Sequence, residues 1–237
     1  MKDFHTHILP NMDDGSQDII TSLEMLKSLK LQGADGVVLT PHYYYDVEDV
    51  GAFLIRREIS VNELLKHIET RHNYPNIYLG AEVAFFPNMS KYKDIDRLCI
   101  EGTKYMLLEM PFGKWSHDTL EEVDNLYNNK NIVPIIAHLE RYIAFQKGTN
   151  NINDLLKLNL IIQINSGAFK RKIIRPKYHK FLTTSDIYVI GSDSHNMDER
   201  KPDLKKAIEY INNSIGKNRL MNINQLGDEI LINATRL

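Results

Sequence analysis

The chain has 237 residues, of which 43% are hydrophobic and 25% are charged, as is typical of a globular protein. The formal net charge of −2 gives no sign of the basic surface with which proteins bind nucleic acid. The single cysteine, Cys99, excludes an internal disulfide framework and suits a reducing compartment. Charged residues interrupt the N-terminus, and no apolar run is long enough to span a bilayer. We therefore expect a cytoplasmic protein with no direct membrane insertion and no nucleic-acid partner.

Short apolar runs alternate with longer amphipathic segments along the chain. Strands are predicted at 1–5, 36–40, 76–83, 104–110, 132–138, 160–165 and 187–195. Helices are predicted at 16–33, 48–72, 90–100, 117–129, 151–159, 175–185 and 203–215, and the remainder of the chain is also expected to be helical. Ser16 is the candidate N-cap of the first helix, and Gly33 ends it.

The alternation of strands and helices predicts an α/β fold with a mainly parallel sheet. No linker, repeat or low-complexity tract divides the sequence, so we expect a single domain over 1–237. About seven strand–helix units in one domain favour a closed barrel. An open doubly wound sheet is the alternative, but no glycine-rich phosphate loop follows any predicted strand. The basic segment 170–180 is interpreted as a solvated helix face.

Most of the predicted strands end in a side chain that can bind a metal ion. The strand ends, in chain order, carry His5 and His7, His42, Glu82, Glu109, His138, the amides Gln163 and Asn165, and Asp193 and His195. Because the carboxyl ends of parallel strands lie on one face of the fold, these side chains are expected to meet there. The HTH and DSH sequences each place two such residues on the same side of a strand.

Ordinary structural roles explain some of these residues. Asp14 or Asp193 could cap a helix, and four further histidines are assigned no function: His67, His72, His117 and His179. Glu82 and Glu109 are harder to explain, because they interrupt otherwise apolar strands. Burying an unpaired carboxylate is costly, and metal coordination is one way to relieve that cost.

Imidazole and carboxylate ligands without thiolates exclude a structural zinc site built on cysteines. They suit Mn²⁺, Fe²⁺ or catalytic Zn²⁺. With Asp14 included, nine candidate ligands exceed the needs of one ion. Two or three closely spaced ions would use them all, and such clusters are typical of enzymes that hydrolyse phosphate esters.

Seven motifs along the chain resemble a known superfamily. In order they are HTHILPNMDDG, TPH, GAEV, LLEMPF, AHLER, QINSGA and GSDSHN. They are similar to those of the polymerase-and-histidinol-phosphatase (PHP) superfamily. More narrowly, they resemble the manganese-dependent protein-tyrosine phosphatases of bacterial capsule and exopolysaccharide operons, the CpsB/CapC family. The resemblance covers about residues 1–200 and implies a distorted (β/α)₇ TIM-like barrel with a trinuclear metal site.

The resemblance assigns the nine candidate ligands to three ions. The first ion is assigned His5, His7, Glu82 and Asp193. The second shares Glu82 and adds Glu109 and His138. The third is assigned Asp14, His42 and His195. Mn²⁺ is the expected cofactor, as two or three ions, with Fe²⁺ and Zn²⁺ as alternatives. Where the family usually has proline after the fifth-strand histidine, this chain has Leu139, and Thr6 stands where asparagine is common. Neither departure removes a ligand.

The implied reaction is hydrolysis of phosphotyrosine by a hydroxide that bridges two ions. Arg141 is the candidate phosphate clamp, and a surface salt bridge with Glu140 is its alternative role. Asp14 and a site histidine such as His42 are candidate general acids, between which the sequence does not decide. The implied substrate is a phosphotyrosyl protein, expected to be the tail of a membrane-associated tyrosine kinase that controls polysaccharide synthesis.

Aromatic residues near the predicted strand ends could form the walls of a phosphotyrosine pocket. They are Tyr43, Tyr44, Tyr45, Phe112 and Trp115. For each of them separately, core packing is the favoured interpretation. A cysteine-dependent phosphatase is excluded, because the residue six positions after Cys99 is Tyr105 rather than the arginine that closes such a phosphate loop. Cys99 is expected to be a buried helix residue.

Three other functions compete with the tyrosine phosphatase. A small-molecule phosphomonoesterase of the histidinol-phosphatase type would use the same metals. A metal-dependent deaminase or amidohydrolase also begins with HxH, but it needs a lysine or further histidines where this chain has Glu82 and Glu109. A non-catalytic module that docks on a kinase would be free to lose its metal ligands, whereas all of them are present here.

Overall fold

A computed structural model describes residues 1–68, 70–170 and 186–237. Its strands pair in parallel and form two sheets. The first sheet, in spatial order, contains β1 (Lys2–Asp3), β2 (Gly36–Leu39) and β4 (Asn76–Leu79). The second contains β3 (His42–Tyr43), β5 (Glu82–Ala84), β6 (Tyr105–Glu109), β7 (Val133–Ile136), β8 (Ile161–Asn165) and β9 (Tyr188–Gly191).

Backbone hydrogen bonds connect the two sheets. The chain from β2 to β3 runs beside the chain from β4 to β5, and the two stay paired where the sheets meet. There Glu82 N donates to Pro41 O at 3.0 Å. At the other side, Phe4 N donates to Ile190 O at 3.0 Å, so the start of the chain pairs with β9. The predicted parallel α/β class is confirmed, and these bonds are compatible with the predicted distorted barrel.

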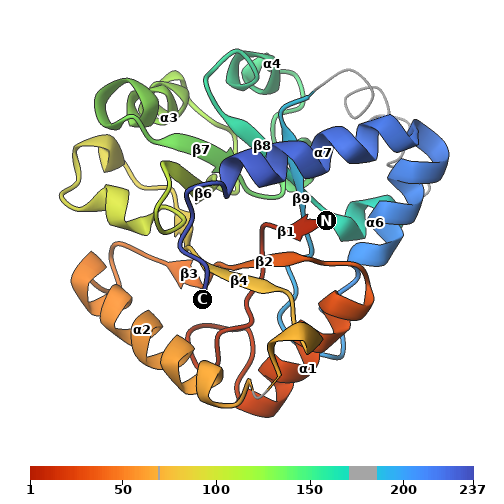
Figure 1. Ribbon diagram of the computed structural model, residues 1–237. Coiled ribbons are helices and arrows are strands. Elements are labelled where there is room, and N and C mark those ends of the chain that lie inside the picture. The colour runs from red at the N-terminus through yellow and green to blue at the C-terminus, as the bar shows by residue number, and fades with distance from the viewer. Residues whose placement is uncertain (69, 171–185) are drawn as a thin grey trace.

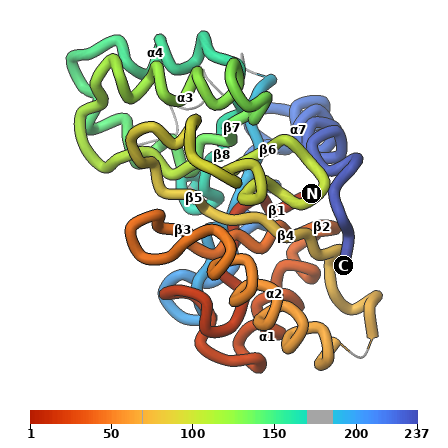
Figure 2. The backbone as a smooth tube through the Cα atoms, turned by 90° about the vertical axis from the view of Figure 1, so that its left-hand side faces the viewer, coloured from red at the N-terminus to blue at the C-terminus, as the bar shows by residue number. Residues whose placement is uncertain are grey.

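Helices surround the strands (Figure 1). They are α1 (Ile19–Leu31), α2 (Val50–Lys66), α3 (His117–Lys130), α4 (Asn151–Leu155), α6 (Leu204–Tyr210) and α7 (Lys217–Ile230). Short 3₁₀ helices are η1 (Arg71–Asn73), η2 (Met89–Lys91), η3 (Ile95–Leu98), η4 (Leu139–Arg141) and η5 (Ser166–Lys170), and η6 (Ile211–Ile215) is a π-helix. Figure 2 places α1 and α2 on one side of the strands and α3 and α4 on the other. Within the described ranges, no helix combines the length and the apolar character needed to cross a bilayer.

Several predicted helices differ from the observed ones. Asp18, not Ser16, caps α1, because its carboxylate accepts the Thr21 N–H at 2.8 Å. The predicted helix at 90–100 is two separate 3₁₀ turns, and between them Asp94 has a left-handed backbone with φ 62°. The helix at 48–72 ends at Lys66, and the one at 151–159 is limited to α4. The predicted helix at 175–185 and nearly all of the basic segment 170–180 lie outside the described residues.

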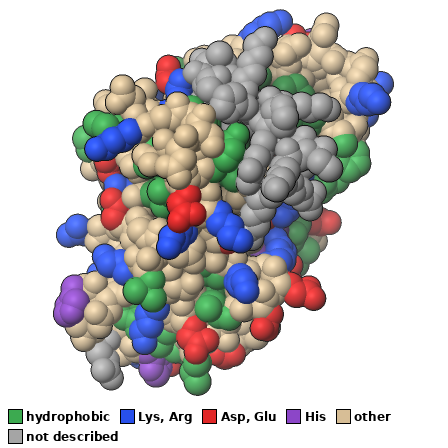
Figure 3. Space-filling model, turned by 90° about the vertical axis from the view of Figure 1, so that its right-hand side faces the viewer, with side chains coloured by type: hydrophobic (Ala, Val, Ile, Leu, Met, Phe, Trp, Pro, Cys, Tyr) green, Lys and Arg blue, Asp and Glu red, His purple; other side chains and the backbone are tan. Residues whose placement is uncertain are grey.

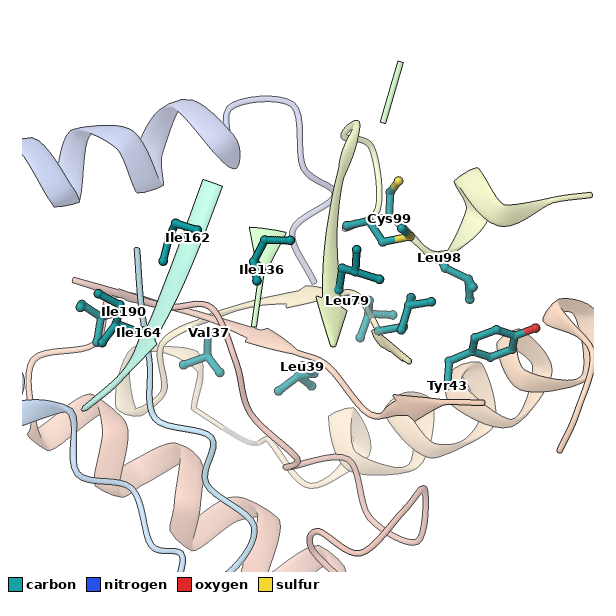
Figure 4. Close-up of a cluster of buried hydrophobic side chains, with 14 of the residues drawn as sticks. Val37, Leu39, Tyr43, Leu79, Leu98, Cys99, Ile136, Ile162, Ile164 and Ile190 are labelled. Atoms are coloured by element: carbon teal, nitrogen blue, oxygen red, sulfur yellow. The ribbon is translucent and has the colours of Figure 1, made fainter. Parts of the chain in front are cut away.

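Successive side chains of each strand pack on opposite faces. The larger apolar cluster contains Val37 and Leu39 of β2, Ile136 of β7, and Ile162 and Ile164 of β8. It also contains buried residues of α1, α2 and α3, so this face of the strands packs against the helices. Figure 4 shows these strand residues pointing into the cluster, together with Tyr43 and Cys99.

A second, smaller cluster lies on the opposite face of the strands. It contains Val38, Leu107 and Ile135, each adjacent in sequence to a residue of the larger cluster. Ile230 and Leu231, at the end of α7, belong to it as well. Helix α7 contacts β1 and β9 and lies beside the N-terminus in both views (Figures 1 and 2). On the surface shown in Figure 3, acidic and basic side chains are interspersed, in agreement with the small net charge.

Candidate metal centre

All nine predicted ligands lie together, and the buried carboxylate of Glu82 is at their centre. Its Oε2 atom lies 3.0 Å from His5 Nε2, 3.2 Å from His7 Nε2 and 3.1 Å from His42 Nδ1. Its Oε1 atom lies 3.0 Å from His138 Nε2. One carboxylate therefore contacts four imidazole rings that come from three different strand ends, since His5 and His7 follow the same strand.

Four overlapping groups of side chains around Glu82 could each hold an ion. In each group the donor atoms lie within 4.8 Å of one another. The groups are His5, Glu82 and His138; His5, His7 and Asp193; His42, Glu82 and Glu109; and His7, Asp14, His42 and His195. Because the groups share residues, ions held there would lie close together, and the two oxygens of Glu82 could serve two of them.

The strand alternation explains how two of the carboxylates reach this site. Val83 belongs to the helix-facing cluster, so Glu82, its neighbour, lies on the opposite face. Leu108 and Met110 enclose Glu109 in the same way. His138 and Asp193 follow the ends of β7 and β9 and have left-handed backbones, with φ of 33° and 53°. Such conformations are unfavourable for residues with a side chain and occur often at functional sites.

The loop after the first strand holds His7 in place. Asp13 Oδ2 lies 2.7 Å from His7 Nδ1 and accepts the backbone N–H of His42 at 2.9 Å. Gly15 packs directly on His7, since an added Cβ would lie 2.2 Å from the His7 carbonyl oxygen. Sequence analysis assigned no role to Asp13. Its place beside Asp14 in the DDG loop was the signal that it lies near the metal ligands.

Buried atoms without hydrogen-bond partners indicate that the residues fit a metal cluster. Among the described residues, the buried atoms His42 Nδ1 and His195 Nε2 make no hydrogen bond of good geometry, although carboxylate oxygens of Glu82 and Asp14 lie 3.1 and 3.3 Å from them. A buried polar atom without a partner is costly. The nitrogens of imidazole and the oxygens of carboxylates are also the donors that Mn²⁺, Fe²⁺ and Zn²⁺ accept. The donor set therefore fits divalent cations.

The histidines of the site divide into two electrostatic classes. Burial lowers the pKa of His42, and burial together with the charge of His7 lowers the pKa of His195 to about 3. Burial also disfavours the charged forms of His7 and His138, but hydrogen bonds to carboxylates outweigh it. Those bonds, from Asp13 and Glu82, raise the pKa of His7 to about 10. Protons on His7 and His138 thus balance the charge of the buried carboxylates.

The carboxylates show the matching shifts. Burial opposes the charged forms, but His5 and its neighbours hold the pKa of Glu82 well below its usual value. The charges of His5 and Arg141 lower the pKa of Asp193 to about 2. Both groups are therefore ionised at neutral pH and available as ligands.

Two arginines lie at the open side of the cluster, and both contact Asp193. The Arg141 guanidinium forms an ion pair with Asp193 Oδ2 and has 36% of its side chain exposed. Arg200 Nη2 lies 2.8 Å from Asp193 Oδ1, and its Nη1 lies 3.5 Å from Asp14 Oδ2. Among the ion pairs identified for the described residues, Arg141 contacts Asp193 rather than Glu140, its alternative partner, and Glu140 accepts the backbone N–H of Asn165.

Sequence analysis missed Arg200. It lies five residues after His195, and the loop between them folds back because His195 N donates to Arg200 O at 2.8 Å. A basic residue shortly after the last ligand motif was the signal.

The aromatic residues near the strand ends have mixed roles. Tyr43 and Trp115 are buried in the core, as the packing interpretation expected. Tyr44 is 41% exposed and stacks on His42, with 5.3 Å between ring centroids. Phe112 is 54% exposed, and its ring lies 6.0 Å from that of His138. Two exposed aromatic rings thus flank two of the candidate ligands.

Tyr45 and Cys99 do not contact the candidate ligands in any interaction identified among the described residues. Tyr45 stacks on Phe86, with 4.3 Å between ring centroids. Cys99 is buried just after η3 rather than within a helix, and burial raises the pKa of its thiol to about 12. A thiol that is protonated at neutral pH cannot serve as a phosphatase nucleophile.

The histidines that received no function lie elsewhere, as far as the structure describes them. His67 and His117 are exposed side chains near acidic residues of their own helices. His117 lies close to Asp118 and Glu121, and all three side chains are exposed. His179 lies outside the described residues.

Comparison with known proteins identifies relatives over nearly the whole chain. Residues 1–233 match the family model "Capsular polysaccharide synthesis, CpsB/CapC". The chain is 28% identical over 232 residues to tyrosine-protein phosphatase CpsB of Streptococcus agalactiae serotype V, which covers 92% of this chain and 93% of that protein. It is 25% identical over 241 residues to tyrosine-protein phosphatase YwqE of Bacillus subtilis strain 168, covering 99% and 93% of the two chains.

A solved structure shares the fold. It comes from the crystal structures of YwqE from Bacillus subtilis and CpsB from Streptococcus pneumoniae, described as unique metal-dependent tyrosine phosphatases. It superposes with a TM-score of 0.84 at 24% sequence identity and covers 100% of this chain and 97% of that chain. Together with the family model, these relatives confirm the resemblance seen in the motifs: the chain belongs to the CpsB/CapC family of capsular polysaccharide synthesis.

Proposed function

We propose that this protein is a metal-dependent protein-tyrosine phosphatase that acts as a single domain. One observation carries the proposal: eight imidazole and carboxylate side chains from across the chain surround the Glu82 carboxylate at one end of the parallel strands. Relatives over more than nine-tenths of the chain are named tyrosine-protein phosphatases, which supports the reaction class.

The nine residues are proposed to hold two or three divalent cations, with Mn²⁺ as the expected ion and Fe²⁺ and Zn²⁺ as alternatives. Two of the three ligand sets that the family resemblance implies are supported by single groups: Asp14, His42 and His195 belong to one group, and His5, His7 and Asp193 form another. The remaining set, Glu82, Glu109 and His138, is divided between two groups that share Glu82. Divalent cations at such a site supply Lewis acidity and lower the pKa of coordinated water. The low pKa of Glu82 and the neutral imidazoles of His42 and His195 favour cation binding at neutral pH.

Arg141 and Arg200 are proposed to bind the phosphoryl group. Guanidinium groups match phosphate oxygens in charge and in bidentate geometry. In the metal-free protein both arginines are paired with Asp193. Cations bound to Asp193 would compete with these pairs and leave both guanidinium groups available to an incoming phosphate.

Neither candidate proton donor is favoured as a general acid. The lowered pKa of His42 leaves its imidazole without the proton that a general acid must give. Asp14 has 63% of its side chain exposed and Oδ1 3.3 Å from His195 Nε2, and a carboxylate that binds a cation is likewise deprotonated. Because a phenolate leaves readily, the proposed reaction does not depend on a proton from either residue.

The proposed substrate is a phosphotyrosyl protein, and the proposed partner is a membrane-associated tyrosine kinase of capsule or exopolysaccharide synthesis. The exposed rings of Tyr44 and Phe112, next to two candidate ligands, provide apolar surface suited to a phenyl group. These rings favour an aryl phosphate such as phosphotyrosine as the substrate, rather than histidinol phosphate, which is an alkyl phosphate.

Metal analysis paired with activity assays tests the proposal. The full-length protein would be stripped by a chelator and resupplied with Mn²⁺, Fe²⁺ or Zn²⁺, then assayed on a phosphotyrosyl peptide and on histidinol phosphate. We expect two or three ions per chain, activity only after metal is restored, and preference for the peptide. Full activity in the stripped protein would contradict the metal requirement, and preference for histidinol phosphate would contradict the substrate.

A further inference from the structure

Strand β8 differs from its neighbours at the candidate metal centre. It lies between β7, which leads to His138, and β9, which leads to Asp193. At the same level β8 carries two amides, Gln163 and Asn165, which are 0% and 8% exposed. The oxygen of each amide accepts a hydrogen bond within the protein, so we do not count either amide among the candidate ligands. Buried amides in the middle of a ligand cluster need a reason, because polar groups are costly to bury unless they are hydrogen-bonded.

The oxygen of Gln163 contacts two of the candidate ligands. It accepts the backbone N–H of His138 at 2.7 Å. Because a backbone nitrogen can only donate, this bond fixes which end of the amide is oxygen. The same oxygen lies 3.0 Å from His5 Nδ1. His5 must therefore carry a hydrogen on Nδ1, so Nε2, which faces Glu82 at the centre of the site, is the ring nitrogen left to bind a cation.

The nitrogen of Gln163 continues the chain of hydrogen bonds toward β9. It donates to Asn165 Oδ1 at 2.8 Å. With its oxygen engaged there, Asn165 uses Nδ2 to donate to Asp193 Oδ2 at 2.9 Å. A single backbone N–H thus sets the orientation of two amides, one imidazole and one carboxylate in sequence.

We propose that Gln163 and Asn165 are positioning residues for the metal centre: they fix the Nδ1–H form of His5 and hold His5, His138 and Asp193 in the arrangement that binds cations. The inference rests on the metal centre of the proposed function. It extends that function, because it assigns a role to residues that bind neither metal nor substrate. Partners of this kind orient metal ligands, and their loss typically weakens metal binding about 10- to 100-fold.

Gly191 provides independent support, because it keeps the space that this network occupies. It pairs in register with Asn165 on the adjacent strand. A Cβ atom at this position would lie 2.5 Å from His5 Cβ and 2.6 Å from Gln163 Nε2. The fold therefore leaves room for the Gln163 amide to lie against His5, and even a methyl group would displace it.

Two substitutions at one position separate the role of the amide from that of its volume. Gln163→Met keeps the length of the side chain but removes both the acceptor and the donor. Gln163→Glu keeps an oxygen that accepts from His5 and from the His138 backbone. On the full-length chain, competition with a chelator would measure the dissociation constants of Zn²⁺ and Mn²⁺. We expect Gln163→Met to weaken binding about 10- to 100-fold and Gln163→Glu to restore it.

Gln146→Met is a matched control. Gln146 is also a buried glutamine, 3% exposed, that bonds to backbone: it accepts the Trp115 N–H at 3.1 Å and donates to Gly113 O at 2.7 Å. It contacts no candidate ligand in these bonds. Its replacement should lower the melting temperature but leave both metal dissociation constants unchanged. An equal loss of metal affinity in Gln146→Met would show a general packing effect and overturn the proposal.

The hydrogen on His5 Nδ1 gives a second readout that a packing role would not change. In ¹⁵N-histidine NMR spectra of the Zn²⁺-loaded protein, this hydrogen should exchange slowly with water in wild type and in Gln163→Glu, where it is hydrogen-bonded, and faster in Gln163→Met. Unchanged affinity or an unchanged exchange rate of this hydrogen in Gln163→Met would overturn the relay. If that variant does not fold, Asn165→Ala decides: weaker binding supports the relay and wild-type affinity overturns it. A wild-type protein that binds neither ion would instead refute the proposed function, and the relay with it.

Discussion

The two faces of the parallel strands differ in side-chain polarity along the direction of the strands. On the helix-facing side, β8 carries Ile162 and then Ile164, both in the larger apolar cluster. On the opposite side, the same strand carries apolar Ile161 and then the amide Gln163. In β6 the change runs from Leu107 to the carboxylate of Glu109. One face stays apolar throughout, whereas the other becomes polar toward its carboxyl end.

This difference separates stability from function within a few residues. Apolar side chains stabilise the fold by leaving water, at roughly 25 cal/mol per Å² of buried surface. Buried carboxylates and imidazoles do the opposite unless they are paired. A cluster that opposes folding persists only if it serves another purpose. Substitutions at the polar end should therefore change metal binding and activity, and substitutions at the apolar end should change stability.

Glu82→Ala should have the largest effect on function. Glu82 contacts four imidazoles and belongs to two of the ion-holding groups. Its loss should weaken metal binding by more than the 10- to 100-fold expected for an outer partner, and it should abolish measurable phosphotyrosine hydrolysis. Elemental analysis of the variant checks the prediction. Full metal occupancy would contradict the bridging role of Glu82.

Arg141→Ala should have the next largest effect. Removing one charged group that stabilises a transition state typically lowers kcat about 10²- to 10³-fold. Arg141 contacts Asp193 at the open side but is not itself a candidate ligand, so the metal content should stay the same. Steady-state kinetics on a phosphotyrosyl peptide, with metal analysis of the same sample, measure both effects. Unchanged turnover, or loss of metal, would count against the clamp.

Leu107→Ala tests the apolar end of the same face. Leu107 is 1% exposed, and truncation of a buried leucine typically costs about 2–5 kcal/mol of unfolding free energy. Leu108→Ala, on the helix-facing side, should cost a similar amount. Chemical denaturation measures both, and the folded variants should bind the wild-type number of ions. Loss of metal in the folded Leu107→Ala protein would mean that the two ends of this face are not independent.

The pH dependence of the metal-free protein should be a smaller effect. The pKa values of His7 and His138 are raised to about 10 and about 9 by their carboxylate partners. A raised pKa means that the folded state holds these protons more tightly than the unfolded state. Their stabilisation is therefore complete below pH 6.5 and is lost as the pH rises through 9–10. Melting temperatures between pH 7 and pH 10 should fall in the stripped protein and fall less with Mn²⁺ present.

Sequence analysis predicted that the candidate ligands would lie together, and the structure confirms their proximity, because local rules position them. Alternation places Glu82 and Glu109 on one face, and the HTH and DSH spacings pair the histidines and the aspartate. The parallel class follows from the order of strands and helices. These features depend on neighbours in sequence, so the pattern of residues is enough to indicate them.

The residues that contact the candidate ligands without being ligands themselves could not be predicted, because their contacts depend on tertiary structure. Arg200 reaches Asp193 only because its loop folds back on His195. Gln163 acts across strands on His5, 158 positions away. The helix predicted at 90–100 failed for a related reason, since left-handed backbone at Asp94 breaks a segment whose apolar spacing is helical. Tertiary structure decides each of these.

Anomalous diffraction from crystals of the Mn²⁺-loaded protein tests the central claim most directly, because it locates the ions themselves. The account predicts two or three manganese peaks in coordination contact with Glu82 and the imidazoles of His5 and His138. Absence of any peak there, or peaks only at the exposed group of His117, Asp118 and Glu121, would contradict it.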